Sequence, residues 1–229
     1  MSTFAIPKHV VVLCHPRSDS FNATIAEGYC AAVREIGQEV VLRDLYRMKF
    51  DPVLKAEEQP GSDNYSVSAD VAHELELLAG VSVLVLVYPI WFGTPPAMLK
   101  GYVERVLGSG FSHRAIHARA RHRLTGTHML SLTSSGTTKQ WLEEQGAWMS
   151  LRMVFDRYLE NAFSLASADH VHFSAVVTGL KDQDVRENLE EVRQAARKVS
   201  SIVLSEHHRQ ELATQAEGIR HAGDPGVLE

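Results

Sequence analysis

The chain has 229 residues, 45% of them hydrophobic, and a formal net charge of −5. This length suffices for the buried core of one domain, which we place at residues 1–208, with a C-terminal tail at 209–229. The negative balance provides no broad cationic surface of the kind that a nucleic-acid backbone requires, so we expect no nucleic-acid partner.

Cysteine usage and hydropathy indicate a cytoplasmic protein. Cys14 and Cys30 have neither CxxC spacing nor the pattern of a disulfide framework, which fits a reducing compartment. Residues 1–9 contain no apolar segment with a small-residue cleavage site, and the apolar run Val81–Tyr88 is far shorter than a membrane span. We therefore expect neither export nor membrane insertion. The 12 histidines are scattered along the sequence, so we predict no metal site.

Strands and helices alternate five times along the sequence. The predicted strands, mostly short apolar or β-branched runs, lie at Val10–Leu13, Glu39–Leu45, Val81–Tyr88, His128–Thr133 and Val171–Thr178. The predicted helices lie at Phe21–Ile36, at Ala69–Leu78, from Pro96 to a stop at Gly108, at Gln140–Phe163 and at Val185–His207. This alternation favours an α/β fold with one doubly wound parallel sheet, strand order 2-1-3-4-5, and helices on both faces.

A sheet of this order binds its ligand beyond the carboxyl ends of the strands, near the switch point between the first and third strands. Three predicted loops reach this edge, at His15–Asn22, Pro89–Pro96 and Thr133–Thr138. We therefore look for the functional residues in these loops.

The first loop is a candidate phosphate site. Ser18, Ser20 and Asn22 offer hydroxyl and amide groups beside the free N–H groups of a helix N-terminus. The loop has no glycine before Gly28, so it is not the G-x-G-x-x-G turn of a Rossmann dinucleotide site. Helix capping by Ser20 or Asn22 is the alternative role, and His15 either bonds the phosphate or ends the strand.

The second and third loops suit a flat ligand with a polar edge. Trp91 and Phe92 follow a strand at the point where the chain leaves the core, so they either contact a heteroaromatic ligand or cover the sheet edge or a subunit contact. Gly93 and the prolines beside it favour a fixed backbone shape. The hydroxyl and backbone donors of Thr133–Thr138 suit the polar edge of a ring, although an ordinary turn with a helix cap uses the same residue types.

Three segments together carry a resemblance to a known family. They are H-P-R-S-D-S-F-N, Y-P-I-W-F-G-T-P-P-A-M-L-K-G-Y-V-E-R-V-L-G-S-G-F and S-L-T-S-S-G, which begin at residues 15, 88 and 131. In order and spacing they resemble the NAD(P)H:quinone oxidoreductases of the flavodoxin-like superfamily, over residues 9–205. The resemblance implies a flavodoxin-like fold and a bound flavin, FAD or FMN. It also implies two-electron hydride transfer from NAD(P)H to a quinone or related acceptor.

The resemblance also assigns site residues. The flavin phosphate falls to His15, Ser18, Ser20, Phe21 and Asn22, the isoalloxazine ring to Pro89, Ile90, Trp91 and Phe92, and the other polar edge of the ring to Thr133, Ser134, Ser135 and Gly136. Members of the family are commonly homodimers with the active site at the interface, which would account for surplus apolar residues in 141–163, as core packing also would. We favour FAD, with the segment Arg47–Ser68 as a cover for its adenosine, although this segment is equally suited to be an interaction arm.

The sequence departs from the animal enzymes of this family near the substrate. Trp148 stands at the apparent position of a histidine, and Ser112–Ala115 replaces a stretch that carries tyrosine. One hypothesis makes His113 the catalytic proton donor, since its ordinary pKa lies near neutrality; the alternative is an interface or solvent-facing histidine. The basic run Arg114–Arg123 either attracts the phosphates of NAD(P)H or forms a solvated loop.

Three other functions fit the same fold. The first is reduction of azo, nitro or flavin compounds, which differs from the main interpretation only in the acceptor. The second is a cytoplasmic regulatory flavoprotein subunit of a potassium efflux system. The third is a one-electron carrier, which we rank last because carriers usually present a strongly acidic face and the charge of −5 is modest for 229 residues.

Overall fold

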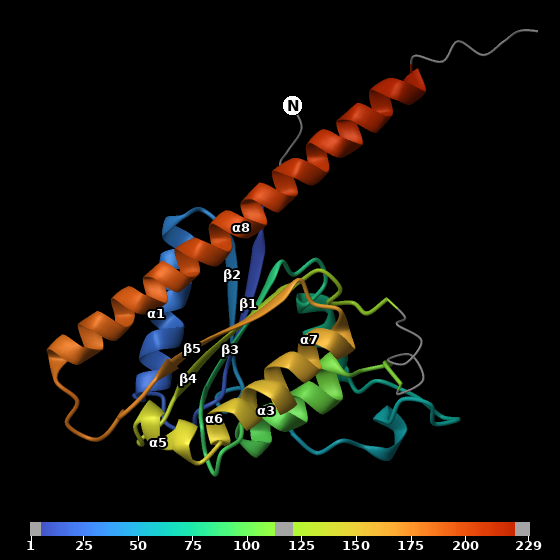
Figure 1. The fold of residues 1–229 in the computed structure, drawn as a ribbon. Coiled ribbons are helices and arrows are strands. Elements are labelled where there is room, and N and C mark those ends of the chain that lie inside the picture. Colours follow the sequence, from blue (N-terminus) through green and yellow to red (C-terminus); the bar gives the residue numbers. More distant parts are fainter. Residues whose placement is uncertain (1–5, 113–120, 223–229) are drawn as a thin grey trace, which may run out of the picture.

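The computed structural model describes residues 6–112 and 121–222, with side chains as far as residue 215. A five-stranded parallel sheet with the order β2-β1-β3-β4-β5 forms the centre of the molecule (Figure 1), which confirms the predicted flavodoxin-like topology. The strands are β1 Lys8–Leu13, β2 Glu39–Asp44, β3 Val83–Pro89, β4 His128–Ser134 and β5 Ser167–Phe173.

Helices cover both faces of this sheet. One face packs against α1 (Phe21–Glu35) and α8 (Asp182–Ala222). The other packs against α2 (Ala69–Leu77), α3 (Ala97–Tyr102) with its π-helical continuation Val103–Leu107, α6 (Ala147–Leu151), the π-helical turn Arg152–Arg157 and α7 (Tyr158–Phe163). The short helix α5 (Lys139–Glu144) precedes α6, and a 3-10 turn at Ala56–Glu58 interrupts the connection from β2 to α2.

The central strand β3 shows why this sequence forms a two-sided core. All seven of its residues are buried, and their side chains alternate between the two faces of the sheet. Leu84, Leu86 and Tyr88 join the cluster under α3 and α7, whereas Val83 and Val87 join the cluster under α1 and α8. On this strand only the carboxyl end is therefore available to a ligand site.

Three predicted boundaries were wrong. The fifth strand runs from Ser167 to Phe173 and not from Val171 to Thr178, because the polar sequence 167–170 pairs with β4 through its backbone although it lacks an apolar pattern. The predicted single helix at Gln140–Phe163 is broken at Gly146, whose φ of +68° is not helical.

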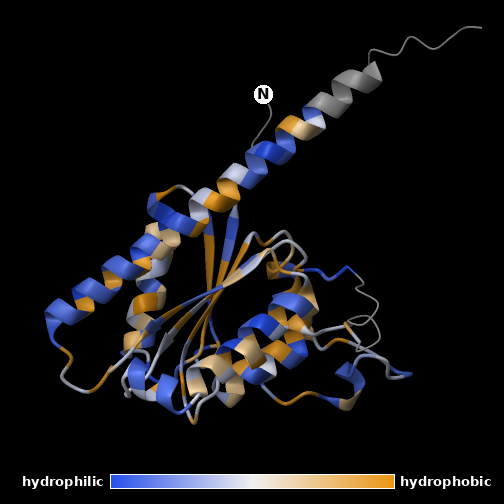
Figure 2. Ribbon diagram, in the orientation of Figure 1, coloured by the Kyte–Doolittle hydropathy of each residue, from blue (hydrophilic) through white to orange (hydrophobic). Residues whose placement is uncertain are grey.

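The last helix was expected to end near His207 but continues to Ala222, so most of the predicted tail is helical. Its sequence after residue 207 contains no proline before Ala222 and is rich in helix formers such as Gln210, Glu211 and Leu212. The C-terminal part of α8 extends beyond the sheet (Figure 1), and its colours are mainly hydrophilic (Figure 2).

A buried arginine fastens the long connection between β2 and α2. The Arg105 guanidinium, completely shielded from solvent, donates two hydrogen bonds of 2.7 Å to Glu58 and one of 2.8 Å to Asp70. It also lies over the ring of Phe50, 5.3 Å from the ring centre. Since Arg105 belongs to the π-helical end of α3, these bonds attach the first part of the predicted cover segment to the body of the protein.

We predict that Glu58→Gln lowers the free energy of unfolding at neutral pH by about 3 kcal/mol, because it leaves a buried guanidinium without its bidentate partner. Hydrogen bonds from Arg105 lower the pKa of Glu58 from 4.5 to about 2. A depressed carboxyl pKa contributes stability above the unfolded value and loses it as the pH falls through the folded value. Chemical denaturation from pH 7 to pH 2 is therefore expected to show the two proteins converging below pH 4.5.

Glu57→Gln is the matched control for this prediction, because Glu57 is the exposed neighbour on the same 3-10 turn. It is expected to keep wild-type stability at both ends of the pH range. Equal stability of Glu58→Gln and wild type at neutral pH would contradict the assignment of Arg105 and Glu58 as the fastening pair.

Candidate functional site

The carboxyl ends of β1, β3 and β4 open into one cleft of about 560 Å³. Its lining comes from the loops after these strands and from the loop after β5. The lining residues are His15, Pro16, Arg17, Asp19, Ser20, Phe21, Asn22, Pro89, Ile90, Trp91, Ser134, Ser135, Gly136, Val176, Val177 and Thr178. The structure thus brings together most of the residues that the sequence nominated.

The start of α1 gives the cleft an anion-binding end. Ser20 is the N-cap, and its Oγ accepts a hydrogen bond of 3.2 Å from the Ala23 N–H, so it has the capping role. Asn22 is 2% exposed; its Oδ1 accepts from the Ser134 hydroxyl at 2.8 Å, whereas its Nδ2 has no partner among the described residues. A buried amide donor without a partner is costly, and beside free helix N–H groups it is suited to a negatively charged ligand.

The loop before α1 is held in shape by local contacts. The Arg17 N–H donates to His15 Nδ1 at 3.1 Å, and Arg17 forms an exposed ion pair of 2.9 Å with Asp19. Partial burial is the main cause that lowers the pKa of His15, so the neutral ring is favoured at this position. The His15 ring centre lies 5.8 Å from that of Trp91, which brings the first loop against the second.

A tight turn forms the second wall. Trp91 and Thr94 exchange backbone hydrogen bonds of 3.0 and 3.1 Å, and the residues between them, Phe92 and Gly93, have positive φ values of 51° and 79°. Trp91 is 40% exposed and lines the cleft together with Ile90, but Phe92 is fully exposed and does not line it. Of the two aromatic residues, only Trp91 is therefore placed as a wall for a flat ligand.

The third loop differs in part from the expectation. Ser134 and Ser135 lie at the cleft, where the Ser135 hydroxyl donates to the Thr137 carbonyl at 2.9 Å. Thr133 does not line the cleft: its fully buried hydroxyl contacts His170 and His172 on the neighbouring strand. The alternation of side chains along β4 explains this, because Thr133 and Ser134 point to opposite faces of the sheet.

Other residues that the sequence analysis singled out do not line the cleft in the described part of the structure. Ser18 lines a neighbouring cavity, and Trp148 packs edge-on against His170 with 4.7 Å between ring centres. His113 and residues 114–120 of the basic run lie outside the described residues. At the end of that run, Arg123 donates to the Ser109 carbonyl at 3.2 Å.

Sequence reasoning missed the fourth part of the lining. Val176, Val177 and Thr178 follow β5 and close the cleft from that side, with the Val176 N–H donating to the Ser135 carbonyl at 2.9 Å. Their apolar, β-branched character led to the prediction of a strand. A signal for the loop was present in Gly179, which has a φ of +86° and follows these residues directly.

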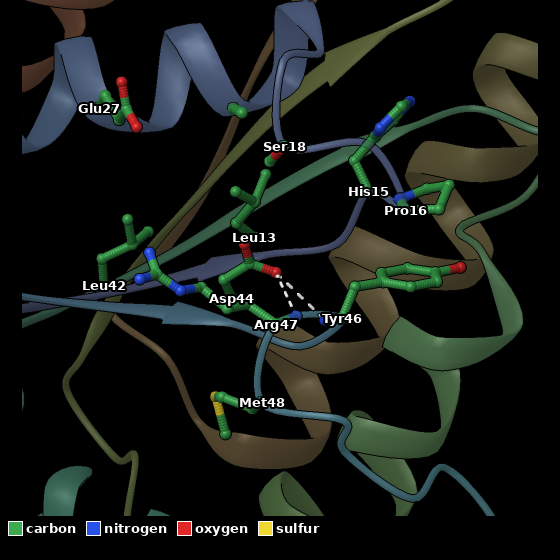
Figure 3. A pocket seen from close by; sticks show the side chains of 11 residues that line it. Leu13, His15, Pro16, Ser18, Glu27, Leu42, Asp44, Tyr46, Arg47 and Met48 are labelled. Carbon is green, nitrogen blue, oxygen red and sulfur yellow. Dashed lines mark hydrogen bonds between the residues drawn. The ribbon is translucent and has the colours of Figure 1, made fainter.

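The neighbouring cavity has about 840 Å³ and lies between the start of α1 and the end of β2 (Figure 3). It shares His15 and Pro16 with the cleft, so the two are separated only by this segment. Asp44 at the end of β2 accepts the backbone N–H groups of Tyr46 and Arg47 at 3.1 Å each, which fixes the far wall.

An apolar surface lies beside the second loop. Four exposed residues form this surface, which we call the apolar face: Met149 on α6, Met153 and Val154 on the π-helical turn after it, and Tyr158 on α7. Their exposed fractions are between 55% and 75%. Val154 also lines a cavity of about 400 Å³ together with residues 93–95, which connects this face to the Trp91 turn. Such a contiguous apolar surface is typical of a protein contact.

Over 6–112 and 121–222, no helix combines the length and apolar character that crossing a membrane requires. Within the same ranges, no group of three or more His, Cys, Asp or Glu side chains is arranged to hold a metal ion.

Comparison with known proteins places residues 7–199 in a family described as having the flavodoxin-like fold. An uncharacterized NAD(P)H oxidoreductase of Haemophilus influenzae is 30% identical over 166 residues, covering 72% of this chain and 81% of the relative. NAD(P)H dehydrogenase [quinone] 1 of Cavia porcellus is 31% identical over 127 residues. The matched region covers 48% of this chain and spans about half, 46%, of the Cavia protein.

Among solved structures, the NAD(P)H:quinone oxidoreductase from Methanothermobacter marburgensis superimposes with a TM-score of 0.69 at 27% identity. The superposition covers 85% of this chain and 96% of that structure.

Proposed function

Since the chain belongs to the flavodoxin-like family of NAD(P)H:quinone oxidoreductases, we propose that it is a flavoprotein that transfers two electrons as hydride from NAD(P)H to a quinone or related acceptor. The observation that carries this proposal is the cleft at the carboxyl ends of β1, β3 and β4, with Nδ2 of Asn22, which has no partner among the described residues, at its anion-binding end.

The residues present fit a flavin. The free Nδ2 of Asn22 and the first N–H groups of α1 are suited to its phosphate. Trp91 and Ile90 form an apolar wall for its ring system, and the segment from Ser135 to Gly136 supplies polar groups for the edge of the ring. When bound, a flavin supplies the hydride chemistry that no side chain offers.

The residues of the protein itself position the ligands and stabilise negative charge in the cleft. The exchanged hydrogen bonds between Trp91 and Thr94 fix the second loop, and the Ile90 N–H donates to the Ser134 carbonyl at 2.7 Å, which fixes that loop to the third. A preformed wall removes part of the cost of orienting ligands. Donors at the start of α1 and in the third loop stabilise negative charge that develops in the cleft.

For the cofactor we propose FAD. The cavity of about 840 Å³ next to the cleft, shown in Figure 3, offers space for an adenosine across the His15–Pro16 segment. Glu27 in its lining is suited to ribose hydroxyls, which carboxylates bind in dinucleotide sites. Mass spectrometry of the flavin released from the purified protein tests this directly, and a mass equal to that of FMN would contradict it.

We propose a homodimer as the working form, with the apolar face as the contact. Covering this face with a second copy would bury exposed methionine and valine side chains next to the Trp91 turn. We also propose a cytoplasmic location, which is consistent with Cys14 and Cys30 both being free and buried.

The test of the function is the visible spectrum of the purified protein during turnover. We expect a flavin band that NADPH or NADH bleaches and that a quinone restores, with azo and nitro compounds compared as acceptors on the same sample. Faster restoration by an azo compound than by any quinone would shift the assignment to that acceptor. A colourless protein that binds neither added FAD nor FMN would contradict the proposal.

We predict that Asn22→Asp separates ligand binding from stability. The aspartate still accepts from Ser134, but it replaces the free donor by a negative charge, so flavin affinity is expected to fall by roughly 100-fold. A carboxylate in the first turn of α1 is favourable toward the helix dipole, so the free energy of unfolding of the flavin-free protein is expected to stay within about 1 kcal/mol of wild type.

Flavin titration followed by fluorescence, together with urea denaturation, measures both quantities. Asn64→Asp makes the same charge change at an exposed position away from the cleft and is expected to alter neither. Wild-type flavin affinity in Asn22→Asp would remove this amide from the phosphate site.

We predict that Val154→Lys converts a dimer into a monomer without unfolding it. Val154 is 75% exposed in the single chain, so the lysine is tolerated there, but a contact through the apolar face would have to bury its charge. Sedimentation velocity measures the change in mass. Leu212→Lys, at a 51% exposed position of α8, is the control that keeps the wild-type mass, and a monomeric wild type would contradict the proposed dimer.

A further inference from the structure

A continuous chain of buried and half-buried polar side chains lies behind the third loop. It begins at Asp156 on the π-helical turn after α6 and passes through His170, Thr133 and His172 to Ser135, which lines the cleft. The four successive donor–acceptor distances are 2.6, 2.7, 2.9 and 3.1 Å. Each link is within ordinary hydrogen-bond distance, and no gap separates the buried carboxylate from the cleft.

The inner end of this chain is isolated from solvent. The side chains of Asp156 and His170 are both 0% exposed, and the second carboxylate oxygen of Asp156 accepts from the Ser131 hydroxyl at 3.0 Å. Trp148 packs against both histidines, with ring centres 4.7 Å from His170 and 5.2 Å from His172. The bulky indole thus covers the chain where the resemblance expected a histidine.

The chain has two complete hydrogen-bond arrangements. A carboxylate only accepts, so His170 donates from Nδ1 to Asp156 in both. In the first arrangement, Ser135 donates to His172, His172 to Thr133, and Thr133 to Nε2 of His170. In the second, His170 carries a proton on both nitrogens, every later bond is reversed, and Ser135 donates to the Thr137 carbonyl at 2.9 Å. The two arrangements differ by one proton.

We propose that this chain is a proton relay that exchanges one proton between the Asp156–His170 pair and the cleft. The proposal rests on the proposed function, because reduction of a quinone consumes a proton that NAD(P)H does not supply. The balance is NAD(P)H + quinone + H⁺ → NAD(P)⁺ + hydroquinone. The hydride brings two electrons and one proton, and the relay delivers the second proton.

Delivery starts from the second arrangement and moves protons only. An acceptor oxygen in the cleft takes the proton of the Ser135 hydroxyl, Ser135 takes one from Nε2 of His172, Nδ1 of His172 takes one from Thr133, and Thr133 takes one from Nε2 of His170. Four N–H or O–H bonds break and four form, and the chain is left in the first arrangement. A solvent proton that enters through the open cleft resets it by the same path.

Charged and titratable groups from each element packed around the proton relay lie close to its side chains. Arg152 lies 3.9 Å from Asp156, and Tyr88 on β3, whose pKa is raised by burial and by the Asp156 carboxylate, packs on the same side. Burial, His170 and Lys139 on α5 lower the pKa of His172 to about 4. His172 is therefore neutral near pH 7, which suits a residue that passes protons on without holding them.

The first experiment needs neither activity nor a variant. Nitrogen NMR of the imidazoles in the wild-type protein is expected to show His170 gaining its second proton and His172 changing tautomer together, at one pH midpoint, because each arrangement fixes both rings. Independent behaviour of the two rings would overturn the relay. A wild type that shows joint behaviour but no reductase activity would instead overturn the proposed function and leave the proton chain in place.

The second experiment breaks the middle of the chain. Thr133→Val keeps the shape of the side chain but removes the hydroxyl, and it is expected to slow reoxidation by quinone by roughly 100-fold at neutral pH. Reduction by NAD(P)H, which needs no proton, is expected to keep its wild-type rate. Below neutral pH the variant's reoxidation rate should rise in proportion to proton concentration, whereas the wild-type rate stays flat.

Two further variants make the result specific. Thr133→Ser restores the hydroxyl and is expected to restore the rate and the flat pH profile. His128→Gln alters a buried histidine outside the relay, at the opposite end of β4 from the cleft, where it bonds Glu206 at 2.8 Å, and is expected to leave both half-reactions unchanged. Equal slowing of both half-reactions in Thr133→Val, or an unchanged pH profile, would overturn the relay.

Discussion

Ser134 joins three of the loops that form the cleft. Its hydroxyl donates to Asn22 at the start of α1, and its carbonyl accepts from the N–H of Ile90 in the loop after β3. These two bonds connect β4 to the loops after β1 and β3 at the carboxyl end of the sheet, where the backbone groups of the loops have no strand to pair with. The anion-binding end, the aromatic wall and the polar edge are thereby held in a fixed relation, which a preorganised ligand site requires.

The apolar character of β3 limits its part in the site to this end of the sheet. β3 is buried on both faces, so its contribution to the cleft is limited to its last residue, Pro89, and the residues that follow it. The buried Arg105 holds the long β2–α2 connection against the π-helical end of α3 through Glu58 and Asp70.

Sequence reasoning succeeded where one physical signal dominated. The apolar run of β3 and the alternation of strands and helices were sufficient for the sheet order, and the positions of the loops followed from it. The sequence-based prediction of secondary structure failed where tertiary contacts override the local pattern of apolar and polar residues. The polar start of β5 at Ser167 is a strand because β4 offers it a pairing edge, and the valines at 176 and 177 form a loop although their type favours a strand.

Side-chain direction was the other limit. Ser134 and Thr133 are adjacent hydroxyl residues in one short motif, and the sequence offers no reason to separate them. The pleat of β4 does so, since it turns Ser134 toward Asn22 and the cleft, and Thr133 toward His170 and the interior. A sequence motif therefore predicts which residues lie at the edge of the sheet. Which of these side chains face the ligand depends on the pleat of the paired strands.

The pleat also accounts for the buried polar chain of β4 and β5. Ser131 and Thr133 on β4 face the same side as His170 and His172 on β5, and Asp156 closes the row from the adjacent turn. Burying such a row of polar side chains costs free energy unless every member is hydrogen-bonded. An apolar row would pack as well against Trp148. Because each of the four links is made and the last one ends at the cleft, the arrangement exchanges protons with the site while adding no charge to its surface.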